Sequence, residues 1–434
     1  MRTCGTCPFC GLLCGGVSFP PSSASALSTD SQNTNCERLS QRWYLAQPTS
    51  SWQLKPLRLG RVLEKNVALA EVAQLLGQSR RTLFCGLATD VSGMRQVIDF
   101  ARLVGGVLDH MHSDALQLNL KLLQHGGWIA TTLSEIRFRA DAIVLVGDSL
   151  LDRFPRLLTL LANESRPMPK LFWLGTDDIR FRTQALLVPD AQTISLKKGE
   201  WLPALSSLLR QVSCKSEHEL ENGKLGAETA AAIHTLHQGL KAAQYATLIW
   251  SAADFPADGD ELILDVLVRL VTKWNETSRA AVLPLAGSNG DVTAQQVCTW
   301  KTGFPLRQAL SPMTADYQPN RYRTLDVLRQ KDCDVAVYVS AFEPIEPPEE
   351  FWGVAGPKII VGHPGLKSAA RADYFFPSGI PGIDHESHLF RGDGVAVVSL
   401  ERKRESLAPA VADWFDQLKS QYMQQHDLSE SSRV

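Results

Sequence analysis

Four cysteines near the N-terminus are the residues whose types and spacing point most clearly to chemistry. Cys7, Cys10 and Cys14 have C-x2-C-x3-C spacing, and Cys36 follows at a distance. Thiolates are soft metal ligands, and four of them suit either tetrahedral zinc or an iron–sulfur cluster. The residues alone leave both metals open, together with a third reading in which the cysteines hold no metal. Cys4 is a fifth candidate ligand.

The remaining thiols and the histidines give weaker signals. Four cysteines stand alone, and we expect each to be a small buried apolar residue: Cys85, Cys214, Cys298 and Cys333. The segment from Asp384 to His388 holds two histidines and two carboxylates. We interpret it as a loop of hydrogen-bonding polar residues rather than a metal site. The basic run Arg402-Lys403-Arg404 is interpreted as solvated surface.

Size and charge exclude several classes of partner. The chain has 434 residues, 44% of them hydrophobic, and a formal net charge of -2. It is long enough for two or three domains, and the near-neutral balance argues against nucleic acid or an anionic membrane as partner. No apolar run reaches the roughly 18–20 residues of a membrane span, and cysteines stand where a signal peptide would have its apolar core. We therefore expect a cytoplasmic protein, in which such cysteines indicate metal or free thiols rather than disulfides.

The elements that must position these residues change in character along the chain. Residues 1–60 hold five of the nine cysteines and a Pro/Ser-rich connection from Pro20 to Ser31, so a metal is expected to supply their folding energy. Beyond them, Val67 to Gly77 and Gly93 to Val104 have helical periodicity. The segments Lys215 to Gly226 and Glu343 to Glu350 are expected to be irregular.

Short apolar runs bounded by turns predict buried strands. These runs are Thr82–Cys85, Val107–Leu108, Ala142–Val146, Leu171–Leu174, Thr247–Trp250, Ala281–Leu283, Val335–Val339 and Lys358–Val361. The runs are continuously apolar and separated by gaps of helix length. This pattern predicts parallel strands in α/β sheets, in two Rossmann-like regions.

Several words of the sequence resemble the B subunit of formylmethanofuran dehydrogenase, over nearly the whole chain. Cys7 to Cys14 matches that family's Cys-Pro-Phe-Cys-Gly-x-x-Cys opening, and Asn35-Cys36 matches its fourth cluster ligand. Further matching segments are Glu135–Asp141, Pro155-Arg156, Gln296–Trp300, Gly303–Pro305, Ala372–Pro377 and Gly382–Gly394. The cysteine opening and the Cys-Thr-Trp word within Gln296–Trp300 are the most specific of these.

The resemblance implies the α/β fold of the molybdopterin oxidoreductases. A cysteine-cluster segment would span residues 1–60, a Rossmann-like pterin-side domain residues 61–112 with 283–434, and an inserted α/β domain residues 113–282. In the family, a 4Fe–4S cluster passes electrons to a tungsten or molybdenum bis-pterin that interconverts carbon dioxide and formate.

The resemblance also implies site residues. The cluster ligands would be Cys7, Cys10, Cys14 and Cys36, with zinc as the alternative metal. Ligands of such sheets lie outside the carboxyl ends of the strands. The ancestral pterin pocket would therefore be framed by Asp109, Asp148, Asn289, Thr293, Cys298 and His363.

The sequence departs from the family where that family binds its metal. Counting without a gap from Asp109 to Gly127, the cysteine or selenocysteine ligand falls at Ala115 and its histidine neighbour at Leu116. An alanine methyl has no lone pair for a metal. The family's second loop, Gly-His-Tyr-Asn-Val-Thr-Gly, appears here as Ser288 to Ala294 without its histidine. We therefore expect molybdenum or tungsten pterin to be absent and this chain's own catalytic activity to be lost.

Resemblance to a bacterial relative explains this departure: the B subunit of the formyltransferase/hydrolase complex. That complex occurs in methylotrophs that oxidise formaldehyde to formate through tetrahydromethanopterin-linked one-carbon metabolism. By resemblance, the D subunit transfers the formyl group to a methanofuran-type carrier and the A subunit hydrolyses formyl-methanofuran. The sequence thus predicts a non-redox structural subunit with A, C and D partners. The alternatives are a redox-active B subunit of formylmethanofuran dehydrogenase and a zinc-bearing interaction protein.

Overall fold

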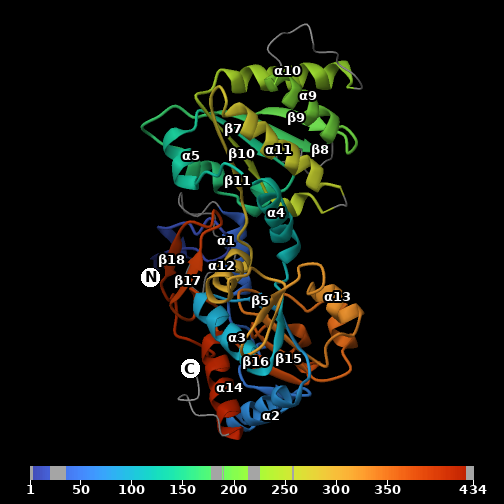
Figure 1. Cartoon of the computed structure of the whole chain (residues 1–434). Coiled ribbons are helices and arrows are strands. Elements are labelled where there is room, and N and C mark those ends of the chain that lie inside the picture. The colour runs from blue at the N-terminus through green and yellow to red at the C-terminus, as the bar shows by residue number, and fades with distance from the viewer. Residues whose placement is uncertain are drawn as a thin grey trace. The chain divides into compact units, whose positions relative to one another are not determined.

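The computed structural model describes residues 3–19, 36–176, 188, 190–213, 225–256 and 259–426. The chain divides into two compact units (Figure 1). Unit 1 comprises residues 1–113 and 287–434, and unit 2 comprises residues 114–286. Three features named above lie outside the described residues: the Pro20–Ser31 connection, Cys214, and the Lys215–Gly226 segment apart from its last two residues.

A nine-stranded sheet forms the centre of unit 1, in the order β13-β12-β6-β5-β14-β15-β16-β3-β4. The strands are β13 (Ala315–Tyr317), β12 (Gln308–Leu310), β6 (Gly106–Leu108), β5 (Thr82–Ala88), β14 (Val335–Ser340), β15 (Lys358–Gly362), β16 (Tyr374–Pro377), β3 (Leu57–Arg58) and β4 (Arg61–Val62). The run from β6 to β16 is parallel, and the strands at both edges are antiparallel. All of β5 is buried, as expected for a central strand of such a sheet.

Helices α2 (Lys65–Gln78), α3 (Val91–Val104) and α14 (Val411–Gln425) pack together in unit 1, and α12 (Asp291–Thr302) packs on α3. α3 shows why a helix starts where it does. The Asp90 carboxylate accepts the backbone N–H of Gly93 at 2.9 Å, which satisfies a donor that the first turn leaves free. The helix stops at Gly105, whose φ of 73° suits glycine.

The smaller elements in the described part of unit 1 are two β-hairpins, two short helices and two 3-10 turns. Two hairpins pair β1 (Thr3–Gly5) with β2 (Val17–Phe19) and β17 (Ser387–Phe390) with β18 (Val397–Leu400). The short helices are α1 (Glu37–Leu45) and α13 (Thr324–Arg329), with 3-10 turns η3 (Glu349–Gly353) and η4 (Lys367–Ala370).

Unit 2 contains a fully parallel five-stranded sheet in the order β11-β10-β7-β8-β9. Its strands are β7 (Ala142–Val146), β8 (Lys170–Thr176), β9 (Gln192–Leu196), β10 (Tyr245–Trp250) and β11 (Arg279–Pro284). From β7 the chain adds β8 and β9 on one side, then crosses to add β10 and β11 on the other. The order therefore reverses between β7 and β10, which makes that point the topological switch of the sheet.

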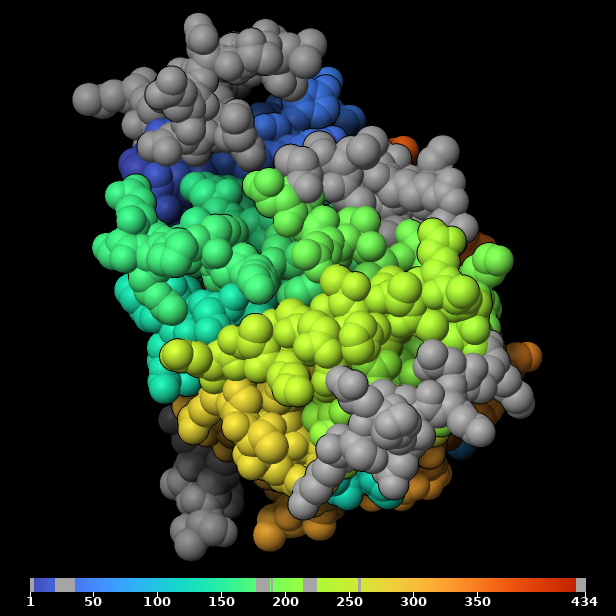
Figure 2. Space-filling view, turned by 90° about the horizontal axis from the view of Figure 1, so that it is seen from above, coloured from blue at the N-terminus to red at the C-terminus, as the bar shows by residue number. Residues whose placement is uncertain are grey.

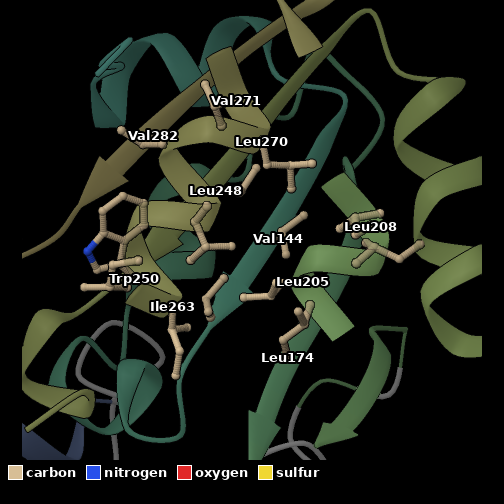
Figure 3. Close-up of a cluster of buried hydrophobic side chains, with 14 of the residues drawn as sticks. Val144, Leu174, Leu205, Leu208, Leu248, Trp250, Ile263, Leu270, Val271 and Val282 are labelled. Carbon is tan, nitrogen blue, oxygen red and sulfur yellow. The ribbon is translucent and has the colours of Figure 1, made fainter. Parts of the chain in front are cut away.

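The helices of unit 2 are α4 (Ser113–Gly126, from the unit boundary), α5 (Leu133–Arg139), α6 (Leu150–Arg153), α7 (Leu157–Leu161), α9 (Trp201–Ser213), α10 (Ala227–Lys241), η2 (Ala252–Asp254) and α11 (Glu261–Trp274). Figure 3 shows apolar side chains from the strands, such as Val144 and Leu248, meeting Leu205 of α9 and Leu270 of α11 in one core. In Figure 2, the yellow-green residues that include α10 form part of the visible face of this unit.

The predicted α/β fold is confirmed. Each expected strand is present, with limits that differ by a few residues, and both sheets have the parallel pairing that the apolar runs indicated. The Glu343–Glu350 segment is irregular until η3 begins at Glu349. Within the described part of the chain, no helix is long and apolar enough to cross a membrane.

Candidate metal centre and the loops at the strand ends

The predicted ligands Cys7, Cys10 and Cys14 lie on the tight loop between β1 and β2. The N–H of Cys7 donates to the carbonyl of Cys14 at 3.0 Å, which closes the loop. Cys36 stands at the start of α1. All four thiols are buried, whereas Cys4 is exposed. Cys4 therefore differs from the other four candidate ligands in its exposure to solvent.

The thiols of Cys7 and Cys10 have raised pKa values. Burial raises the pKa of the Cys7 thiol well above its usual range, and Cys10, Cys14 and Cys36 each raise it further. Burial also raises the pKa of Cys10, while the backbone N–H of Leu12 holds that pKa down. N–H donation to sulfur favours the thiolate form that a metal binds.

The chemistry of this donor set fits a thiolate-bound metal centre. Cys7, Cys10, Cys14 and Cys36 would hold the group, which would supply electron transfer if it is a 4Fe–4S cluster and folding energy if it is zinc. Among the described residues, no three His, Cys, Asp or Glu side chains are arranged so that they could hold a metal ion. The ligand set therefore stays a prediction from the sequence.

Two arginines of α1 bind the loop after β11, and Arg38 also binds the cysteine loop. Arg38 donates from Nε to the carbonyl of Phe9 at 3.1 Å and from Nη2 to Ser288 Oγ at 3.3 Å. Arg42 donates to Asn289 Oδ1 at 3.3 Å and pairs with Glu343. The Ser288–Ala294 loop of the predicted pterin pocket thus lies against the candidate metal centre.

Asn289 is held at three of its polar atoms. Besides the contact from Arg42, its amide nitrogen lies 3.2 Å from His112 Nε2, and its backbone carbonyl lies 3.1 Å from His110 Nε2. It has a φ of 53°, in the left-handed region where asparagine is tolerated better than most residues. Burial lowers the pKa of His110 to about 3, so this imidazole is neutral and donates from Nε2. Sequence reasoning missed both histidines, although they follow β6 directly.

Asp109, predicted for the pterin pocket, forms a buried ion pair with Arg307. Its carboxylate lies 3.4 Å from Arg307 Nε and accepts the backbone N–H of Thr324 at 2.7 Å. The same guanidinium donates to Ser113 Oγ at 3.0 Å. Burial raises the pKa of Asp109, and Arg307 opposes that rise. Asp109 is therefore engaged within the protein.

Two further pocket candidates are also engaged internally. Thr293 Oγ1 accepts the backbone N–H of Phe390 at 2.9 Å, which joins α12 to β17. Cys298 is fully buried on α12, and burial raises its pKa above the usual range while the Gln308 side chain opposes the rise. Cys298 is thus an interior residue, as we expected for the isolated thiols. Cys85 and Cys333 are buried as well.

His363 differs from these residues because it retains an unsatisfied polar atom. It follows β15, is buried, and accepts the N–H of Gly365 on Nδ1 at 3.0 Å. Its Nε2 has no hydrogen-bond partner in the described structure. Trp52 packs edge-on at 4.8 Å, and burial lowers the pKa of His363 to about 3.

Asp148 and Ala115 belong to unit 2. The Asp148 carboxylate accepts the N–H of Thr176 at 2.6 Å and its hydroxyl at 2.5 Å. Ala115 lies in the first turn of α4, and its methyl packs against the apolar core of unit 2. Leu116 beside it is buried. The position predicted to have lost the metal ligand therefore packs as an apolar residue.

The basic run near the C-terminus is not solvated surface, and that interpretation is wrong for two of its three residues. Lys403 has 1% of its side chain exposed and lies over the ring of Phe19 at 5.3 Å. Arg404 pairs with buried Asp384 at 2.5 Å and donates to the carbonyl of Ala46. Only Arg402 of the three is exposed. The physical reason is that the N-terminal segment covers this run. Asp384 is hydrogen-bonded as expected for its segment, but His388 lies in strand β17 rather than in a loop.

The sheets and the loops at their carboxyl ends define the class of protein: the chain has a molybdopterin-oxidoreductase-like fold. Acetylene hydratase from Pelobacter acetylenicus matches it with a TM-score of 0.59 and 11% identity, over 95% of this chain and 66% of that one. The formyltransferase/hydrolase complex FhcABCD from Methylorubrum extorquens, solved with methylofuran, matches with a TM-score of 0.70 and 23% identity, over 86% of this chain and 99% of that chain. No family model matches.

The sequence comparison identifies more specific relatives than the structural comparison does. The chain is homologous to the B subunits of formylmethanofuran dehydrogenase and of the formyltransferase/hydrolase complex Fhc, which confirms the resemblance. The B subunit of tungsten-containing formylmethanofuran dehydrogenase 2 from Methanocaldococcus jannaschii is 22% identical over 90% of this chain and 91% of its own. The B subunit of the Methylorubrum extorquens Fhc complex is 25% identical over 74% of this chain and 84% of its own.

Proposed function

We propose that this chain is the B subunit of a formyltransferase/hydrolase complex and serves there as a non-redox structural subunit. The single observation that carries the proposal is Ala115. Its methyl group packs against the core of unit 2, at the position that counting without a gap from Asp109 aligns with the dehydrogenases' metal ligand. Neither Ala115 nor Leu116 can bind a metal.

The predicted pocket residues of unit 1 support the same proposal. Asp109 is committed to Arg307, Asn289 to Arg42 and the histidines of the β6 loop, and Thr293 to the backbone of Phe390. A bound pterin would have to break these contacts in order to gain partners of its own. The residues present therefore do not fit a molybdenum or tungsten pterin.

The complex defines the partners. In this proposal the chain assembles with A, C and D subunits, and the complex carries the formyl group on a methanofuran-type carrier. Transfer of a formyl group and its hydrolysis to formate need no electron acceptor. The chain can therefore lose its redox chemistry while its fold continues to support the other subunits. The homology to the Fhc B subunit and the match to the four-subunit Fhc complex support this assembly.

A second candidate is a redox-active B subunit of formylmethanofuran dehydrogenase, which would convert formyl-methanofuran and water to carbon dioxide and methanofuran. The four buried cysteines favour it, because a scaffold has no need of a 4Fe–4S cluster. This alternative requires a metal held by groups other than Ala115.

Elemental analysis of the anaerobically purified complex distinguishes the two. We expect tungsten and molybdenum well below one per complex, and no reduction of a viologen dye by formyl-methanofuran or formate. Formyl-methanofuran hydrolysis should proceed. Stoichiometric tungsten or molybdenum, or formate-dependent dye reduction, would contradict the proposal.

The cysteine site is tested separately by Cys36→Ser, with the exposed thiol variant Cys4→Ser as the matched control. Loss of iron or zinc in the first variant only would identify Cys36 as a ligand and exclude Cys4. The hydrolase activity should not change in either variant, because the cluster has no step to serve.

A further inference from the structure

The parallel sheet of unit 2 has the strand order that in other proteins receives a nucleotide. Ligands of such sheets bind beyond the carboxyl ends of the two strands where the order reverses. In this chain those strands are β7 and β10. The residues that follow them are Gly147-Asp148-Ser149 and Ser251 to Asp254. These loops form the switch-point crevice.

The carboxylate of Asp254 occupies the switch-point crevice. It has 6% of its side chain exposed and accepts the backbone N–H of Ser149 at 3.0 Å, together with the Ser149 hydroxyl. The nearby cation Arg153 lies 3.6 Å from the same carboxylate. The donors that would face a phosphate at this turn are therefore directed at a side chain of the protein.

The backbone geometry shows how closely this carboxylate approaches. Gly147 has a φ of 111°, a conformation that residues with a side chain rarely adopt. A Cβ atom added there would clash with the side chain of Asp254. In nucleotide-binding turns, a bare glycine allows the pyrophosphate to approach the chain. Here Asp254 uses the space that Gly147 leaves.

The adjoining strand end is closed in a similar way. Asp148 accepts both the N–H and the hydroxyl of Thr176 at the end of β8, and Trp173 donates from Nε1 to the carbonyl of Gly147 at 2.8 Å. An incoming phosphate would meet two carboxylates whose charge has the same sign as its own. It would also have to displace them from donors that they already satisfy.

We infer that unit 2 is capped by its own carboxylates and does not accept the nucleoside diphosphate end of a pterin dinucleotide. This inference rests on the proposed function and extends it, because loss of the metal ligand alone would still permit a metal-free pterin dinucleotide to bind. Here the nucleotide half of the cofactor is excluded as well, by residues distant in sequence from Ala115.

Two measurements test the inference on the purified complex. The first is analysis of a denatured extract for guanine nucleotide and for pterin fluorescence after oxidation. The second is equilibrium dialysis with labelled GDP up to about 1 mM, which covers weak binding. We expect neither nucleotide nor pterin in the extract and no saturable GDP binding.

The variant Asp254→Asn removes the charge and keeps the shape. It should raise the GDP bound at about 1 mM to at least about ten times the amount retained by the unmodified complex. Asp265→Asn is the matched control, since that carboxylate pairs with Arg269 on the surface of α11 in the same unit. The control should behave as the unmodified complex does.

Three results would overturn the inference: stoichiometric nucleotide in the extract, saturable GDP binding by the unmodified complex, or no gain in Asp254→Asn that retains its circular dichroism spectrum. If this variant fails to fold, the extract still decides. Nucleotide or pterin without tungsten or molybdenum would overturn the inference and leave the proposed function intact. Pterin together with the metal would overturn both.

Discussion

Replacing Arg404 with alanine should loosen the N-terminal cysteine segment whether or not a metal is bound. The guanidinium forms a two-point pair with Asp384, at 2.5 Å and 3.1 Å, and donates to the carbonyl of Ala46. It also lies 5.5 Å from the ring of Trp52. Arg404 therefore joins a loop of the C-terminal region to two points of the N-terminal segment.

The expected cost follows from the burial of the partner. Asp384 has 1% of its side chain exposed, so the variant leaves a carboxylate buried with only the backbone N–H of Ile380 among the contacts of the described residues. Breaking a buried pair in this way costs about 3–5 kcal/mol. Arg404→Lys keeps the charge but cannot make the two-point pair, so it should have an intermediate cost.

Hydrogen exchange measured by mass spectrometry tests this prediction, because it reports on residues 36–56 separately from the rest of the chain. Arg402→Ala is the control. It is a neighbour in the same basic run, but its side chain is exposed, and it should change stability by about 0.5 kcal/mol or less. Faster exchange in this segment for Arg404→Ala, and not for Arg402→Ala, is the expected result. Equal exchange rates of residues 36–56 in Arg404→Ala and Arg402→Ala would refute the reasoning. It would also be refuted if the protection of this segment changed only when bound metal was removed and not in Arg404→Ala.

Three other predictions concern stability and can be measured by urea denaturation. Asp109→Ala leaves Arg307 buried without its charged partner and should cost about 3–5 kcal/mol. Leu248→Ala, in the core of unit 2, should cost about 2–5 kcal/mol, whereas Leu262→Ala, half exposed on α11, should cost far less. His363 has a pKa of about 3 when folded, well below its unfolded value, so the unfolded chain gains a proton first. The contribution of His363 to stability should therefore fall by about 1.4 kcal/mol for each unit that the pH drops between roughly pH 6.5 and pH 3, and His363→Asn should remove that contribution while the similar one from His110 remains.

Much of the fold follows from local patterns in the sequence. The apolar run of Ala142–Val146 could be assigned as a buried strand, because continuous apolar residues between turns have few other stable solutions. Helix α3 could be placed within a few residues, because Gly105 ends its periodicity. The cysteine spacing and the Cys-Thr-Trp word identified the relatives that the sequence comparison confirmed.

The partners of the polar residues could not be predicted in this way. Arg404 meets Asp384 twenty residues away and Ala46 several hundred residues away, so nothing in the basic run itself indicated that it would be buried. Asp254 reaches Ser149 across the sheet for the same reason. Hydrogen bonds and ion pairs between distant segments depend on how the strands are ordered, and strand order is a property of the whole chain.

The sequence by itself determined the two observations on which the proposed function rests: four cysteines at ligand spacing, and an alanine at the position that the resemblance aligns with the dehydrogenases' metal ligand. Residue identity is sufficient for that, because a methyl group cannot bind a metal in any fold. Only the tertiary structure decided what became of the surrounding polar residues. Asp109, Asn289 and Asp254 are bound by other parts of the protein, since burial requires that each charge or amide find a partner when the chain folds.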